Sequence, residues 1–412
     1  MERIPYGISC ELGEIMTSAH KLQHKSQIHY NSGLKFFEAT ESREKFKANS
    51  LKELALDFST DMSTRNAARR INRIRHESKG ISATTLRNMV EREGKQIQEC
   101  IEKKCTQVLE QNGFDSAGEL TAELVFLPVQ TKYIDQEVLA AAASALNIKE
   151  YQQSDYESPD TSLNISIDDV GVKRQAETRP KPEEDNQAKR VNNTVVHIQS
   201  EQGNYILNAA NLTRVLKMLI GFLLHLGLMG RQIVIFADGA RDIHSAVYKM
   251  LGFLRIKVIL DWYHLEKKCK EQLSLAFCGR KKRNAFLEEL LPCLWLGNVN
   301  GAIDLLCNVK DEEIKDHEKV VKLIEYFERV RNNIPCYALR KQLGLRNSSN
   351  LGEKANDLVV SNRQKHNGMS WSDDGSLAFA TVSATTLNRQ TGSWIHHRDV
   401  SFEFHIPVSD VA

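Results

Sequence analysis

One stretch decides the fold: IVIFADGARDIHSAVYKMLGFLRIKVILDWYH, residues 233–264, in which strand and helix patterns alternate. A short apolar, β-branched run comes first and stops at the turn pair Asp238–Gly239. Apolar side chains then recur at helical spacing, before a second β-branched run, residues 256–260, stops at Asp261. The pattern predicts two parallel strands joined by a helix, each with a carboxylate at its carboxyl end. Ligands of open α/β sheets bind beyond that edge, so the two aspartates are the first candidates for a functional site.

Composition sets the class of protein. A chain of 412 residues has room for two or three domains. Its formal net charge is only +2, so a polyanionic partner has to be bound by local basic patches. Eight scattered cysteines without a C-x-x-C pair indicate reduced thiols and a cytoplasmic protein. The N-terminus carries no apolar signal core, and the apolar run near residues 216–229 is too short to cross a bilayer, so we expect neither secretion nor membrane insertion.

A basic helical pattern lies upstream, in residues 64–94. The segment from Arg65 to Lys79 holds six basic residues and one acid, and Gly80 lies in the turn that follows. Ser82 is suited to cap a second helix, so the pattern is that of a helix-turn-helix. We expect this region to bind DNA, with base edges met near the start of the second helix by Thr84, Thr85, Arg87 and Asn88.

A second domain is predicted after the polar linker 151–162. The alternating run LNISI, residues 163–167, reads as a strand that delivers Asp168 and Asp169 at its end. Residues 173–190 have no apolar period and predict a long loop. Two more strands joined by a hairpin follow, then a capped helix that leads into residue 233. Three antiparallel strands followed by alternating helices and strands is the ribonuclease H order.

About eighty helical residues follow His264, which is too much helix for a loop and predicts an inserted helical domain. The capped helix after it, SNLGEKANDLVVSNRQK, places Leu351, Ala355 and Leu358 on a packed side and Glu353 on an adjoining stripe. Glu353 can thus reach the strand-tip site. Asp168, Asp238 and Glu353 would then converge from distant parts of the chain, as two-metal chemistry with Mg²⁺ or Mn²⁺ requires.

This combination of motifs resembles the DDE transposases of bacterial insertion sequences related to the Mutator superfamily, over roughly residues 165–371. The resemblance is carried by SIDDVG for the first acid, FADGARDI for the second, LDWYH as a D-x-x-H signature, and EKANDLVVSNRQKHNGMSW for the third. It implies a ribonuclease H-like catalytic domain, a pair of magnesium ions, and DNA cleavage and strand transfer at element ends.

Three assignments leave alternatives open. Asp169 competes with Asp168, although strand parity puts Asp168 on the face opposite the apolar residues. Asp357 is the alternative to Glu353, whose eighteen-residue distance to Trp371 fits the family spacing better. Asp261 and His264 are given a supporting role as a hydrogen-bonded pair.

The sequence therefore predicts a metal-dependent DNA transposase with catalytic, metal-binding acids Asp168, Asp238 and Glu353. The alternatives are a non-enzymatic, domesticated DNA-binding protein, and a nuclease or resolvase on the same fold. Double-stranded DNA and a further copy of the chain are the expected partners, and no nucleotide-binding motif follows any strand.

The expected DNA-binding residues are Arg65, Arg69, Arg70, Arg73, Arg87, Arg363 and Lys365. The expected parts are a helical DNA-binding region at 1–150, a catalytic core at 160–264, the insertion at 265–345, a core helix at 346–372 and a C-terminal tail at 373–412, with alternating short strands from Gly392.

Overall fold

The computed structural model describes two compact units. Unit 1 comprises residues 1–101, 171–191 and 358–401, and unit 2 comprises residues 102–170, 192–357 and 402–412. Strands are described, without side chains, over residues 2–10, 13–24, 27–30 and 46–47. Side chains are described in residues 49–77, 80–115, 118–119, 121, 132–176, 189–365 and 369–406. Most of the predicted loop at 173–190 lies outside the described residues.

Unit 1 opens with strands where an all-helical region was predicted. The strands β1 (Glu2–Cys10), β2 (Gly13–His24), β3 (Gln27–Tyr30) and β4 (Phe46–Lys47) form one sheet in the order β3-β2-β1-β4. The prediction of helix for the whole of residues 1–150 is therefore wrong for this segment. Its register pairs Glu2 with Lys21 and Cys10 with Gly13, which is a long antiparallel hairpin.

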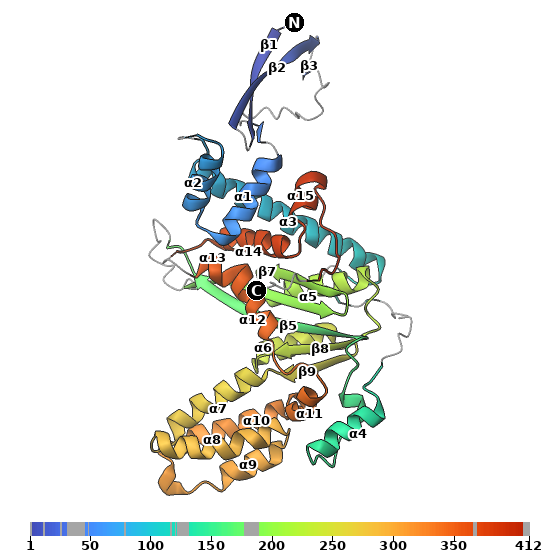
Figure 1. Cartoon of the computed structure of the whole chain (residues 1–412), viewed down its shortest axis with the longest axis vertical. Helices are drawn as coiled ribbons and strands as arrows, with labels where there is room; N and C mark the ends of the chain where they lie inside the picture. The colour runs from blue at the N-terminus through green and yellow to red at the C-terminus, as the bar shows by residue number, and fades with distance from the viewer. Residues whose placement is uncertain are drawn as a thin grey trace. The chain divides into compact units, whose positions relative to one another are not determined.

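Three helices follow (Figure 1): α1 (Asn49–Asp61), α2 (Thr64–Ile74) and α3 (Ala83–Gln111). The part of α3 from Glu102 onward belongs to unit 2. The Ser63 hydroxyl caps α2 by accepting the Asn66 N–H, and the Ser82 hydroxyl accepts the Thr85 N–H at 3.0 Å. Buried apolar residues from all three helices form one cluster, which includes Leu51, Ala55, Ala67, Ala68, Ile71, Leu86 and Met89. The two helices predicted over residues 64–94 are present, and the second continues well beyond them.

The predicted C-terminal tail contains two helices, and the prediction of short strands from Gly392 is wrong for Thr391–His397. The helices are α14 (Asp373–Leu387), capped by the Ser372 hydroxyl, and α15 (Thr391–His397). Helix α14 is buried on most of its surface, so its sequence has no polar face and lacks the helical period. The sequence did not predict this helix, because a fully packed helix carries no amphipathic signal.

Unit 2 is built on a five-stranded mixed sheet with the order β7-β6-β5-β8-β9. The central strand β5 (Ser162–Lys173) pairs in parallel with β8 (Gln232–Ala237), which pairs in parallel with β9 (Ile256–Leu260). On the other side lie β6 (Arg190–Ser200) and β7 (Gly203–Ala209), an antiparallel hairpin. The predicted mixed α/β sheet and its order of strands and helices along the chain are present.

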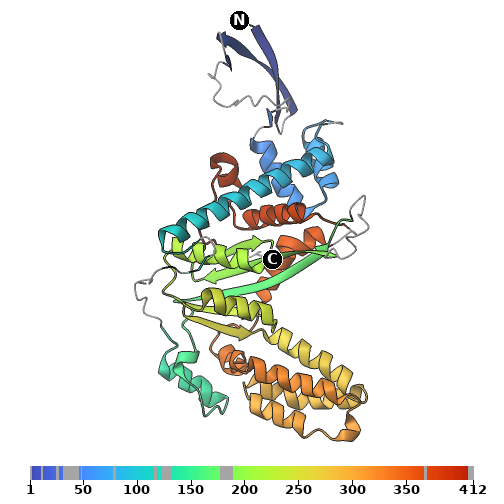
Figure 2. The ribbon, with the colours of Figure 1, turned by 180° about the vertical axis from the view of Figure 1, so that it is seen from behind.

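Helices α5 (Leu212–His225) and α6 (Arg241–Leu251) cover one face of this sheet, as Figure 2 shows from behind. The Asn211 side chain caps α5, and Gly227 ends the turn after it with a φ of 66°. Helix α5 is apolar on nearly all sides because it packs between the sheet and other parts of unit 2. The close approach of α3 is visible at Gly221, where a Cβ would collide with Cys105.

A bundle of four helices is inserted between β9 and the last elements of unit 2. It consists of α7 (Trp262–Ala276), α8 (Arg280–Trp295), α9 (Val299–Cys307) and α10 (His317–Val330). Their buried leucines, alanines and aromatic residues form one core that continues into Phe236 and Leu260 of the sheet. The insertion thus shares a core with the strands that it follows.

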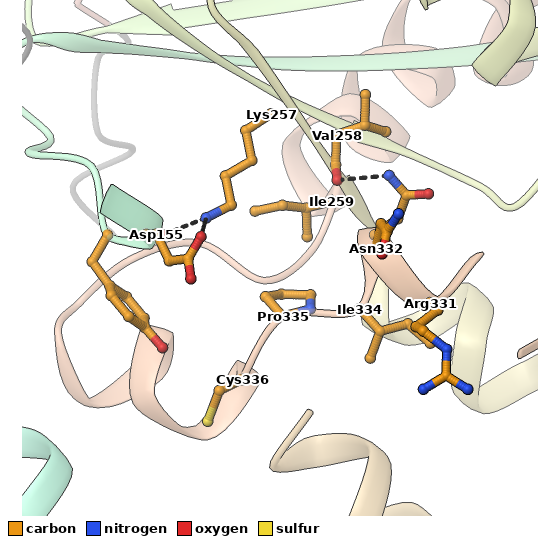
Figure 3. Close-up of a pocket in the computed structure, with 11 residues that line it drawn as sticks. Asp155, Lys257, Val258, Ile259, Arg331, Asn332, Ile334, Pro335 and Cys336 are labelled. Atoms are coloured by element: carbon orange, nitrogen blue, oxygen red, sulfur yellow. Dashed lines mark hydrogen bonds and ion pairs between the residues drawn. The ribbon is translucent and has the colours of Figure 1, made fainter. Parts of the chain in front are cut away.

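The chain returns from the insertion along the free edge of β9. The Asn333 amide donates to the Val258 carbonyl at 3.1 Å, and the Tyr337 hydroxyl donates to the Leu260 carbonyl at 2.7 Å. These bonds satisfy alternate carbonyls of an edge strand and block its pairing with another chain. A cavity of about 200 Å³ lies beside this edge (Figure 3).

A buried ion pair anchors the segment before β5, which the sequence presented as a free polar linker. The Arg340 guanidinium of α11 (Tyr337–Gln342) binds the Glu157 carboxylate through two bonds, of 3.0 and 2.6 Å. Both side chains are almost fully buried, and Arg340 Nε also donates to the Arg346 carbonyl at 3.0 Å. The pair therefore joins three segments of unit 2 that are distant in sequence.

Helix α12 (Asn350–Asn356) continues into a π-helical turn at Asp357–Ser361 and then α13 (Asn362–Gln364). A π turn rotates the residues after it relative to an α-helix. Leu358 is consequently 39% exposed, although regular helical spacing predicted it on the packed side. Among the described residues, no helix has both the length and the apolar character needed to cross a membrane.

We expect Arg340→Leu to lower the free energy of unfolding by about 3–5 kcal/mol, because it leaves the Glu157 carboxylate buried without its partner. Urea unfolding followed by circular dichroism measures this loss. Replacing Glu157 by Gln in the same chain should recover part of it. The control is Lys270→Leu, which breaks the exposed Lys270–Glu266 pair and should cost less than about 1 kcal/mol. Equal losses in the two single variants would contradict the anchoring role.

Candidate active site

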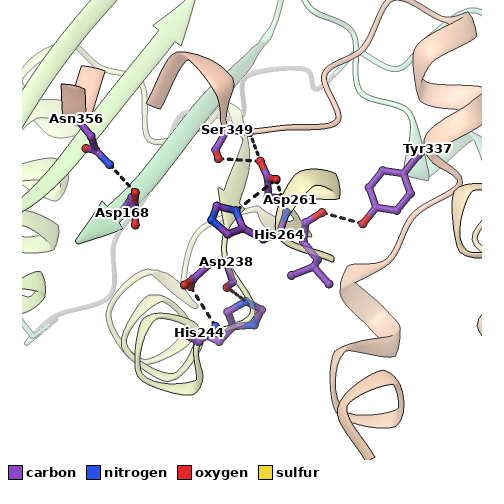
Figure 4. Close-up of polar contacts among 10 residues, drawn as sticks. Asp168, Asp238, His244, Asp261, His264, Tyr337, Ser349 and Asn356 are labelled. Atoms are coloured by element: carbon purple, nitrogen blue, oxygen red, sulfur yellow. Dashed lines mark hydrogen bonds and ion pairs between the residues drawn. The ribbon is translucent and has the colours of Figure 1, made fainter. Parts of the chain in front are cut away.

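Three aspartates of unit 2 lie in one row at the carboxyl edge of the parallel strands (Figure 4). Ser166 pairs with Phe236, and Phe236 pairs with Ile259, so these residues mark one level across β5, β8 and β9. Asp168, Asp238 and Asp261 each come two residues after that level. Side chains along a strand alternate between its two faces with a period of two residues. The three aspartates therefore share the alternation of Ser166, Phe236 and Ile259, which lie two residues earlier. The structure places these three aspartates at one edge of the sheet, although β5 continues past Asp168 to Lys173.

Asp168 is half-buried and held by neutral donors. The Asn356 amide of α12 donates to its Oδ2 at 2.5 Å, and the Asp169 N–H donates to its Oδ1 at 2.9 Å. The pKa of Asp168 is raised to about 6, mainly by burial and also by the negative charge of Asp238, while the hydrogen bond from the Asp169 N–H opposes the shift. Asp169 itself is exposed and accepts a bond from the Thr194 hydroxyl. Of the two adjacent acids, Asp168 is the one that contacts α12.

Asp238 lies in the turn between β8 and α6. Its carboxylate accepts the Ala240 N–H at 3.1 Å, and His244 Nε2 lies 3.2 Å from the Asp238 carbonyl oxygen. The next residue has to be glycine, because a Cβ on Gly239 would collide with the hydroxyl of Tyr326 in α10. The inserted bundle therefore fixes the turn that presents the Asp238 carboxylate.

Asp261 is fully buried and connects three elements. Its Oδ1 caps α7 by accepting the His264 N–H at 3.0 Å, and the His264 ring nitrogen Nδ1 lies 3.4 Å from the same atom. Its Oδ2 accepts both the backbone N–H and the hydroxyl of Ser349, the latter at 2.7 Å. Burial raises the pKa of Asp261, but the hydrogen bonds from His264 and Ser349 outweigh it and the pKa is lowered. Asp261 is thus an ionised structural carboxylate.

The acids around His264 raise the pKa of its ring. The hydrogen bond to Asp261 raises its pKa above the ordinary value, burial opposes the shift, and the charges of Asp261, Asp238 and Glu353 add to it. Three carboxylates thus favour the protonated form of the ring. His264 Nδ1 lies 3.4 Å from Asp261 Oδ1, within ion-pair distance. Ser349, which binds Asp261, and Asn356, which binds Asp168, are site residues that the sequence did not reveal.

Glu353 lies in the first turn of α12 and is half-buried. The helix approaches β5 closely at Gly352, where a Cβ would collide with the Ser166 side chain. One turn later Asn356 reaches Asp168, so the close approach at Gly352 places the whole helix over the row of acids. Asp357, the alternative third acid, is exposed and begins the π turn.

The carboxylates lie at the same edge of the sheet, but among the described residues they are not arranged as a metal-binding cluster. Among the residues that the structure describes, no group of three or more histidine, cysteine, aspartate or glutamate side chains is placed to hold a metal ion. Their mutual effects are electrostatic, as the pKa values of Asp168 and His264 show. Carboxylate oxygens are the donors that Mg²⁺ and Mn²⁺ prefer, so the donor chemistry fits such an ion.

Four of the predicted DNA-binding arginines lie on the exposed surface of α2. Arg65, Arg69, Arg70 and Arg73 are exposed, whereas Arg75 is buried and paired with Glu77. At the start of α3 the side chains of Thr84, Thr85, Arg87 and Asn88 are also exposed.

Two basic residues near residue 365 were predicted to bind DNA. Lys365 is exposed. Arg363 is only 4% exposed: it lies over the rings of Trp371 and Phe379 and donates to the Ser59 carbonyl at 2.9 Å. Arg363 is therefore a packing residue of unit 1, and its prediction as a DNA contact was wrong.

Comparison with known proteins adds little to this geometry. No protein-family model matches the sequence, and no curated protein matches it. One match among solved structures is a chain of the "Drosophila P element transposase strand transfer complex", with 10% sequence identity over 91% of this chain and 86% of that chain. Its TM-score is 0.27, and the function proposed below does not rest on it.

We expect Asp261→Asn to lower the pKa of His264, because the hydrogen-bonded charge that raises it is removed. A histidine whose folded-state pKa is raised stabilises the fold fully below its unfolded value of about 6.5, and this contribution is lost as the pH rises through the folded value. The variant should therefore lose more thermal stability relative to the wild type at pH 6 than at pH 8. NMR titration of the His264 ring and melting curves measure both effects.

The matched control for this prediction is Asp242→Asn. Asp242 is exposed in the first turn of α6 and has no resolved effect on His264. An equal loss of stability at both pH values in Asp261→Asn would contradict the charged pair.

Proposed function

We propose that the protein is a DNA transposase that cleaves and joins phosphodiester bonds with a ribonuclease H-like catalytic core. The single observation that carries the proposal is the row of Asp168, Asp238 and Asp261 across three parallel strands, with Glu353 brought over it by α12. The strand order β7-β6-β5-β8-β9 is that of the ribonuclease H fold, and the row lies at the edge where open α/β sheets bind their ligands.

Asp168, Asp238 and Glu353 are the proposed ligands of a pair of Mg²⁺ or Mn²⁺ ions. When bound, the ions supply activation of the attacking oxygen and stabilisation of the leaving one. The raised pKa of Asp168 supports this role, because it arises from burial and from the facing charge of Asp238, both of which a cation would offset. Asp261, ionised and fully bonded, is the structural member that positions His264 and Ser349.

Exposed side chains beside the row suit a nucleic-acid substrate. Arg241 is the first residue of α6, three residues after Asp238, and is exposed. Tyr263 is 51% exposed in the first turn of α7, and Lys267 is exposed one turn later on the same side of the helix. Cations bind phosphates and aromatic rings stack on bases, so these residues are proposed to hold the strand that is cut.

The helices α2 and α3 are the proposed DNA-binding module for the element ends. The exposed arginines of α2 would bind phosphates, and the start of α3 would meet base edges. Duplex DNA and a second copy of the chain are the proposed partners, because transposition joins two ends. The division into a DNA-binding region, a catalytic core and an inserted bundle belongs to the same proposal.

The second candidate is a DNA-binding protein without catalysis. It is favoured by the fact that, among the described residues, the acids form no metal-binding group of three and that Asp168 is hydrogen-bonded to Asn356. The two candidates differ in whether Asp238 is needed for cleavage, which the next experiment measures.

With Mg²⁺ or Mn²⁺, the full-length protein should nick or join DNA that carries its own element ends. Asp238→Asn should bind the same ends and do neither, because it removes one anionic ligand and keeps the size and turn preference of the side chain. Gel assays of cleavage and binding measure the two effects. Ca²⁺ should support binding without efficient cleavage, because its bonds are longer and its geometry looser.

Asp242→Asn, in the first turn of the following helix, is the matched control and should cleave like the wild type. Equal cleavage by wild type and Asp238→Asn would reject the catalytic assignment. Tight binding with no cleavage under any metal would favour the non-enzymatic candidate.

Replacing Arg69, Arg70 and Arg73 by alanine should weaken duplex binding and flatten its dependence on salt. Each phosphate contact contributes about 0.9 to the slope of log K against log salt, so the slope should fall by up to about 2.7. Fluorescence anisotropy at several salt concentrations measures it. The charge-matched control replaces three exposed lysines of unit 2, Lys149, Lys315 and Lys341. An unchanged slope in the arginine variant would leave α2 as an ordinary packing helix.

A further inference from the structure

We infer that the inserted bundle binds phosphates of the DNA strand through Lys268 of α7 and Arg329 of α10, which lie against the ring of Tyr326 beside the Asp238 turn. Lys268 Nζ lies 5.8 Å from the centroid of this ring, and the guanidinium carbon of Arg329 lies 5.3 Å from it. Side chains from two helices thus bring their positive charges to one place. The inference deepens the proposed function, on which it rests for the choice of DNA as the ligand.

Neither cation is neutralised within the part of the chain that the structure describes. Arg329 is exposed and Lys268 is partly exposed, and neither side chain has a hydrogen bond or a carboxylate within ion-pair distance there. The acids nearest to them in sequence, Glu266 and Glu328, are bound by other cations, at 2.6 and 2.8 Å. Like charges held against one ring repel each other, so the pair indicates an anionic partner.

Two other arginines that lie over aromatic rings have polar partners as well. Arg363 is 4% exposed and donates to a backbone carbonyl at 2.9 Å. Arg398 lies 5.1 Å from the centroid of the Trp394 ring and is paired with the buried Glu93 carboxylate. A ring attracts a cation but does not neutralise its charge. The cations at Tyr326 therefore differ from those two arginines in that their charge is left for a ligand.

The pair of cations lies close to the turn that carries Asp238. The Tyr326 hydroxyl is next to Gly239, because a Cβ on this glycine would collide with it. Burial raises the pKa of Tyr326, the charge of Asp238 adds to the shift, and the charge of Arg329 opposes it. A carboxylate of the row and a cation of the bundle thus act on the same hydroxyl group.

The position favours phosphate as the anion. Lys268 follows His264 by four residues, so α7 carries both side chains on one side of the helix. A strand that reaches the row of acids brings its phosphates past this side, where the carboxylates repel them and nearby cations offset the repulsion. Lysine binds a phosphate as a point charge and arginine binds it through a fork of N–H donors. Such contacts read no bases, so we expect them with DNA of any sequence.

Fluorescently labelled single-stranded DNA of arbitrary sequence tests the inference in the full-length protein, with Ca²⁺ so that the strand binds without efficient cleavage. Arg69, Arg70 and Arg73 of α2 are first replaced by alanine, so that they do not contribute to binding. In that background, Lys268→Gln together with Arg329→Gln should lower the affinity at least about tenfold at low salt. The slope of log K against log salt should fall by up to about 1.4, because each phosphate contact to a single strand contributes about 0.7. Fluorescence anisotropy measures both effects.

The matched control replaces Lys270 and Lys322 by glutamine in the same background. Both lysines lie on the same two helices, and each is already paired with a glutamate one turn earlier. Affinity and slope should therefore stay those of the background protein. Equal effects in the two double variants, or no effect in the Lys268→Gln/Arg329→Gln protein, would overturn the inference.

A deoxynucleoside monophosphate distinguishes a strand from a free nucleotide. It offers a single phosphate, so it should compete only weakly with the labelled strand. Full competition at the same phosphate concentration would overturn the inference, because the two cations would then hold a free nucleotide.

Cleavage of the element ends separates this inference from the proposed function. If the wild type cleaves those ends while the Lys268→Gln/Arg329→Gln protein keeps its salt slope, the inference fails and the proposed function stands. If no metal supports cleavage while the slope falls as expected, the proposed function fails and phosphate binding by the bundle stands.

Discussion

The buried carboxylate of Asp261 is the interaction on which unit 2 depends. One oxygen caps α7 and pairs with His264, while the other receives two hydrogen bonds from Ser349, which is 88 residues later in the chain. A buried charge is tolerated only when its hydrogen-bonding capacity is filled, and here it is filled by His264 of the inserted bundle and by Ser349 at the lead into α12. The same side chain therefore fixes where the insertion starts and where the chain resumes after it.

What the sequence could predict followed from local periods. The β-branched runs before Asp238 and Asp261 predicted two strand ends, and Ser82 predicted the start of α3. The register across three strands has no local signal, because it is set by pairing between segments about 20 to 70 residues apart. That Asp168, Asp238 and Asp261 stand at one level became visible only when the pairing of the strands was known.

Partners distant in sequence were missed for the same reason. The Glu157–Arg340 pair joins residues 183 apart, and the Asn356–Asp168 bond joins residues 188 apart, so no periodicity could reveal either. Helix α14 was missed for a different reason, since burial on nearly all sides removes the polar stripe by which a helix is recognised. The π turn after Asn356 shifted Leu358 out of the packed side that regular spacing assigned to it.

The arrangement of charges explains why α12 has to carry polar residues. Several carboxylates at one sheet edge repel each other, and burial strengthens that repulsion because the local dielectric is low. The structure offsets it with a neutral amide on Asp168, a backbone N–H on Asp238 and the His264 ring beside Asp261. An apolar α12 would leave Asp168 with the Asp169 N–H alone and raise the cost of its ionisation. Gly352, which permits the close approach, and Asn356, which supplies the amide, therefore act together to hold a row of like charges in one place.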